Sequence, residues 1–180
     1  GEIALCTLSA VNLGKVEHVS DIEEPAELIV RALDALLDYQ DYPVKAAENG
    51  SMRRRTLGVG VINYAYYLAK NGVRYSDDSA LSLTHQTFEA LQFYLLKASN
   101  KLAKEQGACP AFNETTYSQG ILPIDTYKKD LDQICPEPLH LDWETLRTEI
   151  TTHGLRNSTL TALMPSETSS QIANATNGIE

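Results

Sequence analysis

The sequence predicts an α/β fold with a mainly parallel sheet, and two features support this prediction. Residues 3 to 8 and residues 56 to 62 are short, nearly continuous apolar runs, without the alternation of a strand that has one face in water. Strands buried on both faces have this composition, and they are typical of parallel sheets covered by helices. Segments with helical spacing of apolar residues follow both runs, which is the element order of an α/β domain.

The first strand-and-helix unit lies near the N-terminus. After the run of residues 3 to 8 and a linker, Ser20-Asp21-Ile22-Glu23 has the form of a capping box at the start of a helix that extends to Tyr39. The helix is amphipathic because leucines recur at helical spacing, at Leu28, Leu33, Leu36 and Leu37.

The second unit follows a turn that the pair Asn49-Gly50 predicts. The apolar run of residues 56 to 62 leads directly into a helix over residues 63 to 70, which Asn71-Gly72 ends. Gly58 and Gly60 resemble part of a dinucleotide-binding motif, but the third small residue is missing. Close packing of a crossing backbone is therefore the favoured interpretation of the two glycines.

The second half of the chain is mostly helix and loop. Residues 78 to 106 predict a long helix that ends before Gly107, with one apolar face made by Leu81, Phe88, Leu91, Leu95 and Leu102. Residues 109 to 138 are rich in Pro, Gly, Tyr and Thr, and they predict a loop with a short helical turn over residues 125 to 134. A modest helix over residues 142 to 153 follows.

Composition and charge restrict the classes of function. The 180 residues are 43% hydrophobic and carry a formal net charge of −9, so a folded core is expected and a nucleic acid partner is not. The triplet Arg53-Arg54-Arg55 is interpreted as a solvated or carboxylate-paired turn before a buried segment. No membrane-spanning run or signal peptide is visible, which predicts a cytoplasmic protein. We expect an internal fragment, because the chain opens without Met on an apolar run.

The cysteines and histidines indicate neither a disulfide framework nor a metal centre. Cys6, Cys109 and Cys135 are odd in number and far apart, so we expect reduced thiols. The histidines lack the close paired spacing of a zinc or iron site; they are His18, His85, His140 and His153. Ordinary surface or core histidines are the favoured interpretation.

Two places in the sequence can carry chemistry, and residue patterns alone leave both open. Residues 158 to 164 resemble a strand, and residues 165 to 171 turn it into a short helix in which Thr168 and Gln171 have capping-box spacing. The helix start offers free N–H groups to an anion such as phosphate, but simple capping of a helix is favoured by spacing alone. Cys6 lies in an apolar strand, where cysteine is more often an inert core residue than a redox thiol.

A resemblance to a known family adds to these patterns. The segment from Leu155 to Met164, with Pro165-Ser166-Glu167-Thr168-Ser169-Ser170-Gln171 after it, closely resembles the diphosphate-binding strand and loop of large subunits of bacterial class Ia ribonucleotide reductases. Residues 4 to 10, 54 to 63 and 104 to 110 extend the similarity over nearly the whole chain. The resemblance implies part of a ten-stranded α/β barrel, with this chain as a single partial domain over residues 1 to 180 that belongs to the second five-stranded half.

The resemblance also implies roles for individual residues. Glu167, Thr168 and Ser169 would bind the substrate diphosphate through backbone amides and hydroxyls. Cys6 would be one of two thiols that reduce the ribose and become a disulfide, with its partner upstream of Gly1. The radical cysteine, the tyrosines that relay the radical and the tail cysteines that reload the thiols would lie outside this chain.

The implied activity is the reduction of ribonucleoside diphosphates by thiyl-radical chemistry, with the fragment inactive by itself. The implied partners are a small subunit that carries a dimetal centre and a tyrosyl radical, thioredoxin or glutaredoxin as reductant, and a second large subunit. ATP and deoxynucleotide effectors would bind elsewhere, and no cofactor is expected on this chain. Two other hypotheses stay open: a non-catalytic phosphate-binding module, and a structural fragment whose strand edges seek a partner chain.

Overall fold

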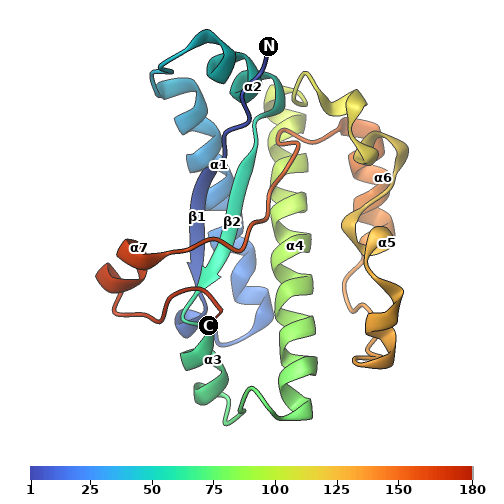
Figure 1. Cartoon of the computed structure of the whole chain (residues 1–180). Coiled ribbons are helices and arrows are strands. Elements are labelled where there is room, and N and C mark those ends of the chain that lie inside the picture. Colours follow the sequence, from blue (N-terminus) through green and yellow to red (C-terminus); the bar gives the residue numbers. More distant parts are fainter. Residues whose placement is uncertain (180) are drawn as a thin grey trace.

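The sheet at the centre of the molecule is a pair of parallel strands. The fold comes from a computed structural model that describes residues 1–179. β1 (Thr7–Asn12) pairs with β2 (Leu57–Ile62) from Thr7 opposite Leu57 to Asn12 opposite Ile62. Helices lie behind and beside the two strands (Figure 1), so the prediction of an α/β fold with a parallel sheet is confirmed.

Helices make up most of the remaining structure. The α-helices are α1 (Glu23–Tyr39), α2 (Lys45–Arg54), α3 (Tyr64–Lys70), α4 (Asp78–Gln106), α5 (Pro123–Thr126), α6 (Trp143–His153) and α7 (Glu167–Ile172). Short 3-10 turns occur at Leu13–Lys15, Val19–Ile22, Phe112–Glu114, Thr116–Gln119 and Lys129–Gln133. The predicted long helix, the helix after the second strand and the loop with a short helical turn are all confirmed.

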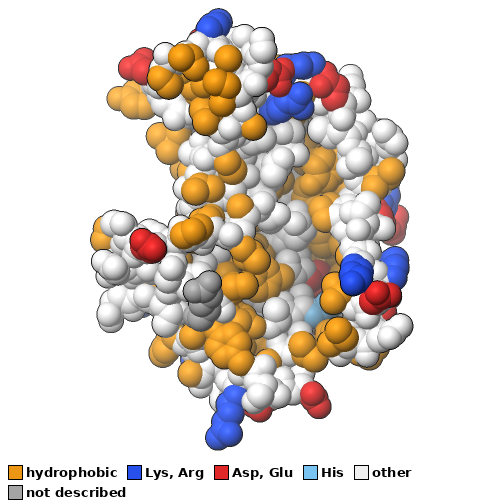
Figure 2. Space-filling view, in the orientation of Figure 1, with side chains coloured by type: hydrophobic (Ala, Val, Ile, Leu, Met, Phe, Trp, Pro, Cys, Tyr) orange, Lys and Arg blue, Asp and Glu red, His pale blue; other side chains and the backbone are white. Residues whose placement is uncertain are grey.

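The two faces of the sheet differ in what covers them. Leu57, Val59 and Val61 are at most 2% exposed and belong to the main core with α1 and α4; we call this side the helix-covered face. Side chains alternate along a strand, so Gly58 and Gly60 point to the opposite side, which we call the glycine face. The C-terminal segment crosses in front of the strands on the glycine face in Figure 1, and hydrophobic side chains gather there in Figure 2.

α1 packs with a different stripe from the one that its leucines suggest. The buried apolar residues are Ala26, Val30, Leu33 and Leu37. Leu28 and Leu36 are 61% and 44% exposed, so half of the predicted leucine face was wrong. The predicted cap at Ser20 was also wrong, because the Asp21 carboxylate accepts the N–H groups of His18 (2.8 Å) and Glu17 (3.1 Å) and starts a 3-10 turn before α1.

Asn49 and Gly50 do not form the predicted turn, since both lie inside α2. A Cβ on Gly50 would overlap the carbonyl oxygen of Ile3, whose own N–H donates to Ala46 (2.9 Å). Glycine is therefore required here by the close approach of the N-terminal segment, and not by a turn conformation.

The two terminal strand predictions were displaced or lost. β1 begins at Thr7 and not at residue 3, and Ile3 and Leu5 are 46% and 43% exposed. The predicted strand over residues 158 to 164 is reduced to one parallel bridge between Val59 and Thr161. The N–H groups of Leu57 and Val59 donate to the adjacent carbonyls of Thr159 and Leu160, and a regular ladder needs alternate residues.

A buried polar network ties the C-terminal segment to the helix-covered side. Asp34 of α1 accepts hydrogen bonds from Arg55 (2.7 Å), Arg156 (3.1 Å) and Asn157 (2.9 Å). The Ser99 hydroxyl donates to the Asn157 side-chain oxygen (2.9 Å) and accepts the Asn157 N–H (3.0 Å). The network joins α1, α4 and the start of β2, and it fixes the point from which the chain turns onto the glycine face.

Candidate functional site

Cys6 lies directly before β1, at the edge of the glycine face. Its residue is exposed, and a Cβ on Gly58 would lie 2.7 Å from its sulfur. The interpretation of Cys6 as a core residue inside a strand was therefore wrong. Partial burial of the thiol raises the pKa of Cys6 above its ordinary value, so the thiol is protonated at neutral pH.

The C-terminal segment crosses the same glycines. Ala162 approaches Gly58 beside Cys6, and Ala162 with Met164 closes over Gly60. The favoured interpretation of the glycine pair, close packing of a crossing backbone, is confirmed. Cys6 and the segment that leads to α7 thus meet over Gly58.

The segment is anchored again beyond α7. Asn63, in the left-handed conformation at φ 69°, donates its N–H to the Thr176 carbonyl oxygen (2.8 Å) and accepts the Thr176 N–H on its side chain (3.1 Å). Ser166 donates its N–H to the Asn177 side chain (2.7 Å). Residues 159 to 177 therefore form a loop held against β2 on both sides of α7.

α7 presents its first turn to solvent. Glu167, Thr168 and Ser169 are exposed, and the N–H of Ser170 is the first that bonds back, to the carbonyl oxygen of Ser166 (2.8 Å). The three preceding N–H groups have no partner inside the helix. The predicted capping box at Thr168 and Gln171 was wrong, because Ser166 is the N-cap and Thr168 lies inside the helix.

Comparison with known proteins identifies the fold that contains these residues. The sequence profile of the family described as "Ribonucleotide reductase, barrel domain" matches residues 1–180. The chain belongs to this family. Within residues 1–179 the sheet has the two strands β1 and β2, so no closed barrel is formed by this part of the chain.

Relatives match most or all of the chain. It is 76% identical over 180 residues to the ribonucleoside-diphosphate reductase subunit alpha of Haemophilus influenzae, covering all of this chain and 24% of that protein. It is 79% identical over 144 residues to the ribonucleoside-diphosphate reductase 1 subunit alpha of Escherichia coli, covering 80% of this chain and 19% of that protein. The ribonucleoside-diphosphate reductase subunit alpha of enterobacteria phage T4 is 53% identical to this chain over 181 residues. The chain spans about a quarter of the length of such relatives.

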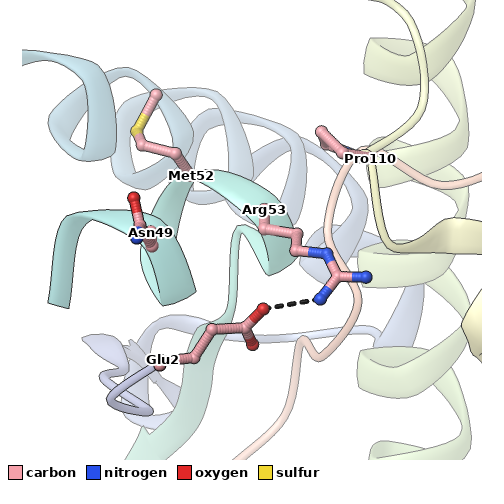
Figure 3. A pocket seen from close by; sticks show the side chains of 6 residues that line it. Glu2, Asn49, Met52, Arg53 and Pro110 are labelled. Carbon is pink, nitrogen blue, oxygen red and sulfur yellow. Dashed lines mark hydrogen bonds and ion pairs between the residues drawn. The ribbon is translucent and has the colours of Figure 1, made fainter. Parts of the chain in front are cut away.

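The arginine triplet of this barrel segment is neutralised by carboxylates. A pocket of about 550 Å³ is lined by Glu2, Arg53 and Pro110 among others, and Figure 3 shows the ion pair of Glu2 with Arg53 (2.6 Å). Arg54 also contacts Glu2 (2.8 Å), and hydrogen bonds from Arg53 and Arg54 hold the pKa of Glu2 below its usual value. Arg55 is buried against Asp34. The predicted carboxylate pairing is confirmed, but Arg53 and Arg54 are the last residues of α2 and not a turn.

The sequence analysis did not identify one cluster of side chains with metal-ligating atoms in this barrel segment. His85 and Glu89 are one turn apart on α4, and the loop before α6 brings His140 to them, so that one ligand atom from each lies within 4.8 Å of the others. The sequence did place His85 and Glu89 four residues apart on one predicted helix, which puts their side chains on the same face. Only the fold could add His140, which is far away in the sequence.

The other two cysteines lie away from this surface. Cys109 is buried, and burial raises the pKa of its thiol, while Cys135 is half-buried in the loop before α6. Across residues 1–179, the helices include none with the length and apolar content needed to cross a membrane.

Proposed function

We propose that this chain is part of a ribonucleoside-diphosphate reductase, and that it supplies one reducing thiol and the diphosphate-binding loop. The observation that carries the proposal is the position of Cys6: an exposed thiol beside the loop that leads to α7, in a chain that belongs to the ribonucleotide reductase barrel family. Relatives that match its full length are named ribonucleoside-diphosphate reductase subunit alpha.

Glu167, Thr168 and Ser169 are the proposed diphosphate contacts. Their N–H groups point out of the first turn of α7, at the positive end of the helix dipole, and two of them add hydroxyl groups. Glu167 contributes its backbone N–H, since its carboxylate repels an anion. Ser170, the buried residue of the helix, holds the turn through its bond to Ser166.

Cys6 is the proposed source of reducing equivalents, together with a second thiol outside this chain. Overall, a ribonucleoside diphosphate and two thiols give a 2′-deoxyribonucleoside diphosphate, one disulfide and one water. The 2′ C–O bond breaks, the oxygen leaves as water, and the thiol pair supplies two electrons and two protons. A protonated thiol suits this role, and the raised pKa of Cys6 keeps it in that form.

The complete enzyme includes parts that this chain lacks. We propose a radical-generating small subunit with a dimetal centre, thioredoxin or glutaredoxin as the reductant, and a homodimer of large subunits. Effector nucleotides bind elsewhere, and the radical cysteine lies in another segment. The fragment alone is therefore inactive, because one thiol without the radical cysteine and the second thiol cannot complete the reduction.

The decisive test compares Cys6→Ser with wild type in the full-length large subunit, combined with its small subunit under thioredoxin turnover. We expect turnover to fall to background, because serine cannot form the disulfide. Cys135→Ser, a change at a half-buried loop cysteine, is the matched control and should keep wild-type turnover. Undiminished turnover of Cys6→Ser would reject Cys6 as a reducing thiol.

The full-length complex also tests the alternative hypothesis of a non-catalytic phosphate-binding module. That alternative predicts nucleoside diphosphate binding without any reduction by the wild-type complex. Binding measured by calorimetry, with Thr168→Val and Ser169→Ala combined as the loop variant, separates the two proposed sites. A Cys6→Ser protein that still binds the nucleotide but does not reduce it, together with a loop variant that binds it more weakly, supports both assignments.

A further inference from the structure

His85, Glu89 and His140 come together on the side of α4 that faces the α5 and α6 region, where histidine surface is visible in Figure 2. We propose that these three side chains form a binding site for a divalent transition-metal cation of the zinc type. The site is separate from Cys6 and α7, and it ties the loop before α6 to the middle of α4. Nothing in the proposed reductase chemistry requires it.

The carboxylate of Glu89 is fixed in orientation by hydrogen bonds, as ligating carboxylates in metal sites are. One carboxylate oxygen, Oε1, accepts the N–H groups of His140 (2.8 Å) and Leu141 (2.9 Å) and the indole N–H of Trp143 (3.0 Å). These three donors fix the carboxylate and leave Oε2 facing the imidazole of His140 (3.3 Å). Outer hydrogen bonds that orient a ligating carboxylate are typical of metal sites.

The buried charge of Glu89 lacks a fixed countercharge. Its side chain is only 3% exposed, and His140 is the only ion-pair partner it has among residues 1–179. Burial disfavours the carboxylate, but hydrogen bonds from Leu141, Trp143 and His140 outweigh it and hold the pKa of Glu89 below its usual value, so the side chain is a buried anion. A metal cation between Oε2 and the two imidazoles would pair with this anion.

His85 contributes an independent sign of a ligand. Its Nε2 is buried, and it finds no hydrogen-bond partner anywhere in residues 1–179. Buried polar atoms are nearly always paired, so an unpaired imidazole nitrogen in this side chain needs a cause. One ring nitrogen of His85 lies within 4.8 Å of the ligand atoms that Glu89 and His140 offer.

The donor set selects the class of cation. Two imidazole nitrogens and one carboxylate oxygen are ligands of Zn²⁺ and its neighbours, at about 2.0 to 2.2 Å from the metal, with a further position for water. His140 is 48% exposed, so an ion can enter from solvent. Glu137, which accepts a hydrogen bond from Gln86 (2.6 Å) and lies 3.8 Å from His140, adds negative charge at the entrance.

A simple ion pair between Glu89 and protonated His140 is the competing explanation. That pair would place His140 without any role for His85, whose Nε2 would stay unpaired. Substitution of His85 therefore separates the two explanations: it removes a ligand from a metal site, but it leaves a Glu89–His140 ion pair intact.

The test uses the full-length large subunit, stripped of metal by a chelator and then desalted. Zn²⁺ binding is measured by calorimetry, and Co²⁺ absorption reports the coordination. We expect one equivalent of Zn²⁺ that His85→Gln and His140→Gln each weaken by more than roughly 100-fold, the upper range for changes outside the ligand shell. His153→Gln is the matched control, because His153, like His85, lies one helical turn from a glutamate, here Glu149, but belongs to no three-residue cluster.

Thermal unfolding provides a second readout. Zn²⁺ should raise the Tm of wild type and of His153→Gln, and it should leave the Tm of His85→Gln unchanged, since a ligand stabilises only the state that binds it. His140→Gln, a change in a half-exposed loop residue, serves if His85→Gln does not fold. Wild-type affinity and stoichiometry in the histidine variants, or no equivalent that depends on them, would overturn the proposal.

Discussion

The helix-covered face and the glycine face of the same two strands have opposite compositions. On the first, Leu57, Val59 and Val61 are almost fully buried, and Asp34, Arg55 and Asn157 form a closed network behind them. On the second, small residues allow an exposed thiol and a crossing loop to lie directly on the backbone. Stability is concentrated on one face, and the proposed chemistry lies on the other.

The largest expected effect comes from the buried network. Burial disfavours the Arg55 cation, but hydrogen bonds to Asp38 and Asp34 outweigh this and hold the pKa of Arg55 above its usual value. Asp34→Ala would leave Arg55 and Arg156 without their buried partner, at a cost of about 3 to 5 kcal/mol. The urea midpoint of the full-length chain measures the loss. Asp38→Ala, at a partner that is 49% exposed, should cost clearly less; equal losses would contradict the comparison.

The next effect tests whether the glycine face serves binding. In Gly60→Val, the new side chain would overlap the Ala162 carbonyl oxygen and Met164, so the C-terminal segment must move. We expect a loss of about 1 to 3 kcal/mol of stability and weaker nucleoside diphosphate binding. Val59→Ala on the helix-covered face should cost roughly 2 kcal/mol but leave binding unchanged. Nucleotide calorimetry on both variants is the measurement, and equal binding losses would break the distinction.

A pH measurement tests the environment of the exposed thiol. Burial disfavours the thiolate, so the pKa of Cys6 lies above its ordinary value of 9.0 and the thiolate fraction at neutral pH is small. Alkylation of Cys6, followed by mass spectrometry across a pH series, should show a midpoint above that of the urea-denatured chain. A midpoint below the denatured value would mean that a cation or helix end stabilises the thiolate.

The smallest effect is expected at the surface ion pairs. Arg53 is 44% exposed in its pair with Glu2, so Arg53→Ala should change the stability little, because water already screens the pair. Added salt should reduce even this difference, because it screens exposed charges. A salt series of urea midpoints provides the check, and a large salt-independent loss would assign Arg53 a structural role.

Local patterns predicted the elements whose partners are within this chain. Residues 57 to 62 and 78 to 106 have apolar content or helical spacing strong enough to define β2 and α4, and Asp142 caps α6 by accepting the N–H of Thr145 (3.1 Å). The strand over residues 158 to 164 was not formed, because strand structure depends on a neighbour in regular register. Asn49-Gly50 was misinterpreted because a packing constraint has the same residue signature as a turn.

The candidate site was less accessible to sequence reasoning. Residue patterns alone favoured an inert Cys6 and a simple helix cap, and only the family resemblance assigned roles to Cys6 and to Glu167, Thr168 and Ser169. Those roles stay predictions. The cluster of His85, Glu89 and His140 was not anticipated, since His140 joins through a loop that no periodic pattern describes.

The sequence by itself determined the α/β class, the long helix, the glycine-lined strand and the family, because each of these depends on residue type and short-range spacing. The tertiary structure decided which leucines of α1 are buried, that Cys6 is exposed beside Gly58, and that the distant His140 joins His85 and Glu89. These depend on contacts between residues far apart in the chain, which only the packing of helices on the sheet brings together.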